Sequence, residues 1–219
     1  MAELTRAEFL EQIADHVEQH VGPVVNVFGE LVSEQVKLDV LVCEPTEERP
    51  CFTFVTCGMS EKPMRIPVQD PEDLALVPEL RFAELLLCLP SNWPVGEEEF
   101  RDPNNFWPIR WLKRLARLPH QYQQWLGAGH TIPNGEPPEP FADNTQFSGW
   151  MLEHPLNFAE EIRKLRTPEK ITNFYALIPL YAEELQLKIA KGGRALAALL
   201  DQAEVSDLLD ITRPNVAKR

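Results

Sequence analysis

Residues 35–57 read QVKLDVLVCEPTEERPCFTFVTC, and this stretch determines the kind of fold that the rest of the chain completes. Every second residue of its first part is apolar: Val36, Leu38, Val40 and Val42. Successive side chains of a β-strand point to opposite faces of the sheet, so this alternation predicts a strand at 35–43 with one well-buried face. The polar stretch EPTEERP predicts a turn, and Cys51–Cys57 is a second predicted strand.

The sequence on either side of this pair extends the sheet. Apolar, turn-bounded segments predict further strands at 24–31 and 81–89, and short turns between the first three indicate an antiparallel meander. Before them, apolar residues recur at spacings of three and four through residues 4–21, which predicts an amphipathic helix. Thr5 is a possible cap for this helix, and Gly22-Pro23 ends it.

Proline-rich stretches separate the elements in the middle of the chain. Residues 59–80 are acidic and rich in proline, so we expect a loop, and its length makes it a candidate for binding. From Trp107 the pattern predicts a helix with Pro108 at its start and a basic outer face. Basic helix faces in an acidic protein are usually internal counter-charges. Residues 127–144 are expected to form another loop.

The second half of the chain alternates strands and helices irregularly. Strands are predicted at 145–152 and 171–180, a short, weakly helical segment at 157–166, and helix from Ala182 to about Asp210 with a break at Gly192-Gly193. We therefore predict an α+β fold, with a central, mostly antiparallel or mixed sheet flanked by helices. No change in composition divides residues 1–219, so a single domain is expected.

Charge and cysteine content restrict the partners and the compartment. Lysine and arginine number 21 against 34 acidic residues, and the net charge of −13 disfavours binding to nucleic acid or anionic membranes. The N-terminus has no secretory signal, and no segment is long and apolar enough to span a bilayer, which predicts a cytoplasmic protein. The four cysteines lie in strand-like segments and are expected to be reduced and buried.

Sequence patterns typical of enzymes are absent. The chain has no G-x-S-x-G, no phosphate-binding glycine loop and no dinucleotide motif. Ser60, His130 and Asp143 are a possible nucleophile, base and orienting acid, but Ser60 and His130 equally suit structural roles at a strand exit and in a loop. His16 and His20 lie four apart on the predicted first helix, and we interpret them as solvent-facing, not as metal ligands. No cofactor or metal is expected.

Aromatic residues concentrate between residues 93 and 125. The cluster contains Trp93, Phe100, Phe106, Trp107, Trp111, Tyr122 and Trp125. Most of them are expected to close a core over the sheet, whereas Trp93 lies in the turn PSNWP and is a candidate for an exposed anchor in a protein interface.

Four stretches together resemble the bacterial suppressor-of-fused-like domains: FVTCGMSEKPM, RFAELLLCLPSNWP, WPIRWLKRLARLPHQYQQWLGAGHTIPNG and FYALIPLYAEELQLKIAKGGRALAALL. The resemblance extends from about Val36 to Arg213 and implies a globular fold around a mixed sheet. The positions that match motifs of the family are Gly58, Ser60, Glu84, Trp93, Pro94, Gly129 and His130. Gly58 is expected to permit a turn closed to other residues, and Glu84 must be paired or hydrogen-bonded if it is buried. Glu84 and His130 either meet in one polar cluster or each bind backbone groups separately.

The resemblance implies a non-catalytic module that binds a protein or peptide, because the animal suppressor of fused holds a short peptide partly through strand addition. Related bacterial domains are regarded as immunity proteins, so a regulatory or immunity-type role with a toxin as partner is one expectation. The alternative is a hydrolase or transferase that uses Ser60, Glu84, His130 and Asp143. A third possibility is self-association through the aromatic region. The oligomeric state does not follow from the sequence.

Overall fold

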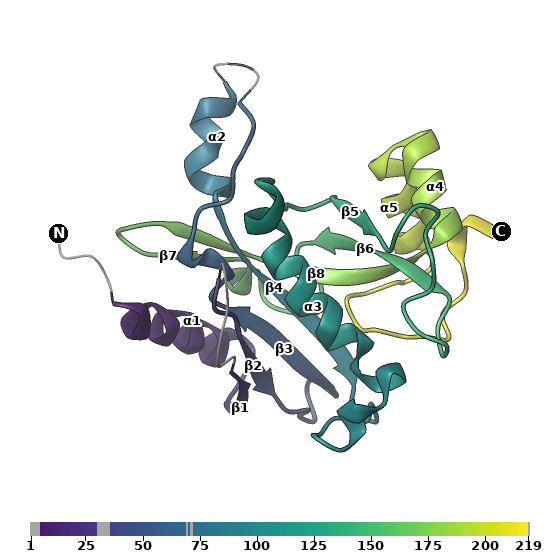
Figure 1. Cartoon of the computed structure of the whole chain (residues 1–219), viewed down its shortest axis with the longest axis horizontal. Helices are drawn as coiled ribbons and strands as arrows, with labels where there is room; N and C mark the ends of the chain where they lie inside the picture. Colours follow the sequence, from purple (N-terminus) through teal and green to yellow (C-terminus); the bar gives the residue numbers. More distant parts are fainter. Residues whose placement is uncertain (1–4, 30–35, 69, 71, 219) are drawn as a thin grey trace.

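A mixed sheet forms the centre of the protein in a computed structural model that describes residues 5–29, 36–68, 70 and 72–218 (Figure 1). Its eight strands are β1 Val24–Phe28, β2 Asp39–Cys43, β3 Cys51–Cys57, β4 Phe82–Pro90, β5 Thr131–Pro133, β6 Phe147–Glu153, β7 Lys164–Arg166 and β8 Ile171–Tyr181. The order is β1-β2-β3-β4-β8-β6-β5, and β7 pairs with the start of β8. β4 and β8 are parallel, and the other pairs are antiparallel. The predicted α+β fold is confirmed.

The antiparallel meander predicted for the first three strands is confirmed in β1 to β3 and continues into β4, with differences in detail. β3 has the predicted bounds, whereas β2 begins at Asp39 and β1 ends at Phe28. The predicted ends of these strands at residues 30, 31 and 35 lie outside the described part of the chain. β2 is buried on both faces, not on one, because Val40 and Val42 enter one core while Leu41 and Cys43 enter another.

Helices lie on both faces of the sheet, and one helix projects away from it (Figure 1). The main helices are α1 Arg6–His20, α2 Asp73–Leu80, α3 Pro103–Tyr122, α4 Ala182–Lys191 and α5 Gly193–Gln202. α1 begins with the predicted Thr5 cap, whose hydroxyl accepts from the Glu8 amide. Successive residues of β4 point to opposite faces of the sheet. Leu85 and Leu87 pack in the core that contains α3, whereas Leu86 and Cys88 pack in the core that contains α1. α1 and α3 therefore cover opposite faces.

Two predictions for the middle of the chain are wrong. Residues 59–80 are not a plain loop, because they contain a short 3-10 helix, η1 Met59–Glu61, and then α2, which projects from the body in Figure 1. α3 begins at Pro103, not near Trp107, because the Asp102 side chain accepts a hydrogen bond from the Asn104 amide and caps the helix there. Pro108 consequently lies inside the helix.

The second half differs from prediction mainly in its short elements. The expected loop at 127–144 contains β5, and residues 157–166 form the 3-10 helix η3 Glu160–Arg163 followed by β7. The predicted break at Gly192 is confirmed, but helix ends at Gln202, well before residue 210. Among the described helices, none combines the length and apolar character needed to cross a bilayer. All four cysteines are free and buried, as predicted.

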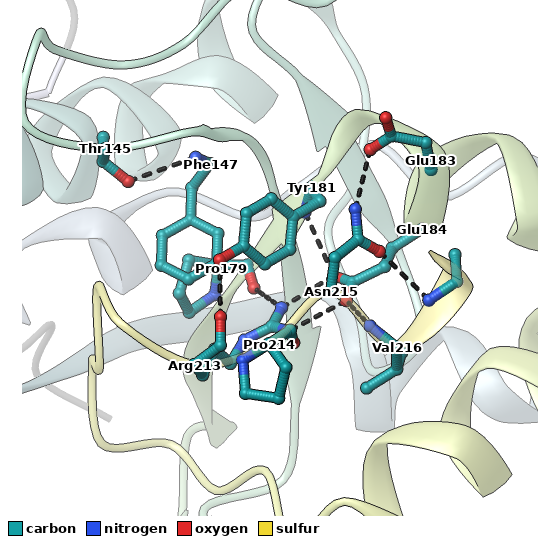
Figure 2. Close-up of polar contacts among 11 residues, drawn as sticks. Thr145, Phe147, Pro179, Tyr181, Glu183, Glu184, Arg213, Pro214, Asn215 and Val216 are labelled. Carbon is teal, nitrogen blue, oxygen red and sulfur yellow. Dashed lines mark hydrogen bonds and ion pairs between the residues drawn. The ribbon is translucent and has the colours of Figure 1, made fainter. Parts of the chain in front are cut away.

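The described C-terminal segment is held against the sheet by a buried ion pair. Figure 2 shows the guanidinium of Arg213 facing the carboxylate of Glu184, with Nη1–Oε1 at 2.8 Å and Nη2–Oε2 at 2.6 Å. Nη2 also donates to the Pro179 carbonyl at 2.6 Å. The guanidinium lies 4.9 Å from the ring centre of Phe147 and 5.0 Å from that of Tyr181.

Candidate functional site

The turn that follows β3 is fixed by a glycine. Gly58 has φ = +126°, a conformation that residues with a side chain rarely adopt, and a Cβ there would collide with the carbonyl oxygen of Lys37. The expectation that only glycine permits this turn is confirmed. The turn leads directly into η1, which places Ser60 beneath the surface with no solvent exposure.

Glu84 of β4 binds this turn from inside the protein. The carboxylate is fully buried. Its Oε1 accepts from the amides of Gly58 and Ser60 at 3.1 and 2.9 Å and from the Ser60 hydroxyl at 2.7 Å. Oε2 accepts from the Thr56 hydroxyl at 2.6 Å. Burial raises the pKa of Glu84, and these four donors oppose the rise. The expectation that a buried Glu84 must be hydrogen-bonded is confirmed.

Lys170 closes the same turn from the side of α1. Its Nζ donates to the Ser60 carbonyl at 2.6 Å and lies 3.8 Å from the ring centre of Phe9 and 4.9 Å from that of Phe82. Burial lowers the pKa of Lys170 to about 8, although the negative charge of Glu84 opposes this shift. Lys170 could not be identified from sequence pattern, because it is far from the turn in the chain and belongs to no recognisable motif.

Two of the family-like stretches lie near one another, and we call them the motif segments. The first comprises residues 58–68, and the second comprises residues 119–130, which include the end of α3 and the loop that carries Gly129 and His130. Gly129 has φ = +79°, and its amide donates to the Leu152 carbonyl at 2.7 Å. The ring of His130 packs edge-on against Trp125, with centroids 4.4 Å apart. Burial lowers the pKa of His130, and the nearby positive charge of Lys188 lowers it further. His130 thus packs among residues of its own loop and of α4.

Three contacts join the two motif segments. His120 Nε2 lies 2.9 Å from the Met59 carbonyl oxygen, the Arg65 amide donates to the Gln124 carbonyl at 3.2 Å, and the Leu126 amide donates to the Met64 sulfur at 3.4 Å. The histidine that touches the G-M-S turn is therefore His120, which sequence reasoning passed over although it lies within the family-like stretch.

Between these segments runs a groove, here called the motif groove. It consists of two adjoining hollows of about 420 and 630 Å³ that share Arg65 and Gln123. One wall is formed by residues 62–68 and the other by residues 119–130; the charged and titratable residues that line it are Lys62, Arg65, His120 and His130. No carboxylate is among the described residues that line either hollow. Burial lowers the pKa of both histidines, so the positive charges that line the motif groove are those of Lys62 and Arg65.

Trp93 is not the exposed anchor that its position in a turn indicated. The side chain is 9% exposed, its Nε1 donates to the Asn105 carbonyl at 3.0 Å, and its ring meets that of Trp107 edge-on. Burial of the indole is favourable here because α3 supplies an acceptor for its N–H group. Pro94 beside it is exposed and lines, with residues 208–212, a separate hollow of about 540 Å³.

The arrangement does not assemble the four residues considered for catalysis. Ser60 and Glu84 are in contact, but no hydrogen bond found in the described part of the chain joins either of them to His130 or Asp143. Asp143 is exposed, whereas Ser60 is closed off from solvent, so a substrate has no access to its hydroxyl. The alternative of separate partners for Glu84 and His130 is the one observed.

The interpretation of His16 in α1 as solvent-facing is wrong. His16 is buried, not solvent-facing, with Nε2 3.2 Å from the Ile162 carbonyl oxygen and its ring 4.7 Å from that of His20. Burial lowers the pKa of His16. Within the residues that the structure describes, no three histidine, cysteine, aspartate or glutamate side chains come together as metal ligands.

Comparison with known proteins gives the family. The sequence model of the suppressor of fused protein family matches residues 34–214, so the chain belongs to this family. No curated protein matches the chain significantly.

Solved structures agree in fold. A suppressor-of-fused homologue from Neisseria gonorrhoeae superposes with a TM-score of 0.67 at 16% identity over 96% of this chain and 97% of that one. The chain in a crystal structure of the Sufu–Fu complex gives 0.65 at 16% identity, covering 96% of this chain and 93% of that one. Drosophila Suppressor of Fused gives 0.63 at 17% identity, and the match covers 96% of this chain but 51% of that one.

Proposed function

We propose that this protein is a non-catalytic module that binds a protein or peptide partner in the motif groove. The observation that carries the proposal is the convergence of both motif segments on this one groove, joined by the three contacts of His120, Arg65 and Leu126. The polar motif residues Ser60 and Glu84 satisfy one another inside the protein, which suits a role in holding the groove wall.

The family gives this proposal its context. One relative of the same fold was solved as the Sufu–Fu complex, which is a complex of that protein with a partner. We infer a regulatory or immunity-type role, in which the chain acts as one domain in the cytoplasm and sequesters its partner, a toxin being one candidate. The buried free thiols support the cytoplasmic location, and the single continuous sheet supports the single domain.

The experiment compares capture of partners by the wild type and by Arg65→Glu, with Arg194→Glu as the matched control. Both arginines are exposed, and Arg194 lies on α5, outside the residues that line the motif groove. Tagged proteins are incubated with lysate of the native host, and bound proteins are quantified by mass spectrometry. We expect a specific partner that Arg65→Glu loses and Arg194→Glu keeps, followed by direct binding of the purified partner in calorimetry.

Other outcomes contradict the proposal. Equal capture of the partner by both variants would exclude the motif groove as the binding site. The absence of any partner for the folded wild type would contradict the binding function itself. The variants at Trp93 and Glu84 are unsuitable for this test, since both side chains are buried and their loss would disturb folding.

A further inference from the structure

A hollow between α5 and the sheet, here called the α5 hollow, has no part in the proposed function. Its deepest lining residues are Met151 of β6 and Ile178 of β8, which lie directly opposite each other in the two strands and are both buried. Leu200 of α5 packs with them in one small core. The volume of about 370 Å³ lies within the range of small-molecule sites. The α5 hollow shares no lining residue with the motif groove.

Small side chains on α5 leave the hollow open. Ala197 and Ala198 line it and are exposed, so neither fills the space between the helix and the strands. Leu156 lines the opposite side and is 50% exposed, and Val205 lines it just beyond the end of α5. A ligand seated here would therefore remove apolar surface from water, which favours binding.

The charged groups that line the α5 hollow are both acidic. Glu153 follows Met151 by two residues in β6 and therefore lies on the same face of the sheet, and Asp201 is exposed on α5. No lysine, arginine or histidine is among the described residues that line the hollow, and Arg194, the one basic residue of α5, is not one of them. The salt bridges found in the described part of the chain include neither carboxylate.

We propose that the α5 hollow binds a small organic cation with an apolar body, of the chemical class of the primary alkylamines. The alkyl part would lie against Met151, Ile178 and Leu156, where its burial stabilises the complex. The ammonium group would stay in the exposed part of the hollow near Glu153 and Asp201, because carboxylates attract a cation and repel an anion. This site goes beyond the proposed function, since it is separate from the motif groove and takes a small molecule.

The test titrates hexylamine into the full chain labelled with carbon-13 at the methionine methyl groups, and NMR follows the methyl signals. The signal of Met151, assigned with Met151→Leu, is expected to shift. The signals of Met59 and Met64, in the core that contains α3, are expected to stay in place.

Related ligands separate the contribution of charge from that of the apolar body. Hexanol and hexanoate have the same chain length without a positive charge, so both are expected to bind more weakly than hexylamine, and hexanoate most weakly. Butylamine is also expected to bind more weakly than hexylamine, since each buried methylene group contributes up to about fourfold in affinity.

Variants locate the site. Glu153→Gln combined with Asp201→Asn is expected to weaken hexylamine binding about tenfold and to leave hexanol binding unchanged. Ala198→Trp is expected to abolish both by filling the hollow, and the exposure of Ala198 makes the change compatible with folding. Glu161→Gln, on exposed η3, is the matched charge control. Arg65→Glu in the motif groove is expected to leave hexylamine binding intact, which separates this proposal from the proposed function.

Three results would overturn the proposal. Binding of hexanol as tightly as hexylamine would show that the hollow does not select a cation. Unchanged hexylamine binding by the Glu153→Gln, Asp201→Asn variant would place the ammonium group elsewhere. A Met151 signal that does not move during the titration, or unchanged binding by the folded Ala198→Trp variant, would exclude the α5 hollow as the site.

Discussion

The carboxylate of Glu84 loses its water on folding and receives four hydrogen bonds in exchange, two from amides and two from hydroxyls. Because all four partners donate, removal of the carboxylate leaves several buried donors without an acceptor, which costs more than the net gain of an ordinary hydrogen bond. The side chain thus acts as the internal support of the G-M-S turn. The hydroxyl of Thr56 is fixed in turn, since it accepts from the Leu85 amide at 2.8 Å.

Two substitutions at Glu84 separate the loss of the acceptor from the loss of charge. Glu84→Ala is expected to lower the free energy of unfolding by about 3 kcal/mol, because all four buried donors lose their acceptor. Glu84→Gln keeps one acceptor oxygen for the turn and relieves burial of a charge, so a loss of about 1 kcal/mol is expected. Urea unfolding measures both; equal losses would contradict the role assigned to the acceptors.

Gly58 and Gly129 both have positive φ but differ in the space around them. A Cβ at Gly58 would collide with the Lys37 carbonyl oxygen, whereas a Cβ at Gly129 would meet nothing within 4 Å. Gly58→Ala is therefore expected to destabilise the protein by about 3 kcal/mol, and Gly129→Ala by about 1 kcal/mol from backbone strain alone. Thermal unfolding of the two variants checks the order, and a larger loss at Gly129 would contradict it.

At the scale of elements, α3 continues through Pro108 because another residue supplies a missing hydrogen bond. Proline has no N–H group to donate to the carbonyl four residues earlier, which is that of Asn104. The Asn144 side chain donates to this carbonyl instead, at 2.9 Å. The loop before β6 thereby completes the helix, and this explains why a proline that predicted a helix start lies inside the helix.

A double-mutant cycle tests this substitution of one donor for another. Asn144→Ala is expected to cost about 0.5–1 kcal/mol in the wild type, since the Asn104 carbonyl loses its donor. In a Pro108→Ala background the alanine amide can donate within the helix, so Asn144→Ala is expected to cost almost nothing. The costs are measured by urea unfolding. Equal costs of Asn144→Ala in the two backgrounds would show that the Asn144 side chain does not replace the hydrogen bond that Pro108 cannot make.

Long apolar elements with polar boundaries were predictable, whereas short or proline-containing elements were not. β3 and β8 are buried strands whose apolar runs are bounded by polar turns, and both were found close to their true bounds. α2 was missed because Pro78 and an acidic, proline-rich sequence indicate a loop, and because exposed Leu74 and Leu76 leave it without an amphipathic pattern. β5 and β7 have three residues each, too few to show a period.

The candidate site was predictable where local backbone or burial dictated the residue. Gly58 and Glu84 follow from a strand exit and from an acid inside an apolar strand, and the structure confirms both interpretations. The pairing of His120 with Met59 and of Lys170 with Ser60 joins residues far apart in the chain. Such contacts depend on the order of strands in the sheet, which local pattern does not specify.

At the scale of the whole molecule, the buried pair of Arg213 and Glu184 connects the described C-terminal segment with α4 and the end of β8 (Figure 2). Glu184 is fully buried, and its carboxylate also accepts a hydrogen bond from the Val216 amide at 3.0 Å. Arg213 and Val216, both in the C-terminal segment, therefore bind this one carboxylate of α4. A pair of this kind contributes little net stability when complete, but a single remaining charge is costly. The C-terminal segment is therefore held in place only while both Arg213 and Glu184 are present.

Because a single remaining charge is costly, the effect of Glu184→Gln on the free energy of unfolding should change sign when Arg213 is replaced. Arg213→Met should destabilise the protein by about 3–5 kcal/mol, because it leaves the Glu184 carboxylate buried without a counter-charge. Glu184→Gln should destabilise the wild type, whereas in the Arg213→Met background it should stabilise, since glutamine removes the orphaned charge and keeps an acceptor for the Val216 amide. Arg213→Lys should recover only part of the loss, because an ammonium cannot form the two-pronged contact. If Glu184→Gln destabilised both backgrounds equally in urea unfolding, the packing of the arginine beside Phe147 and Tyr181, and not its charge, would hold the segment.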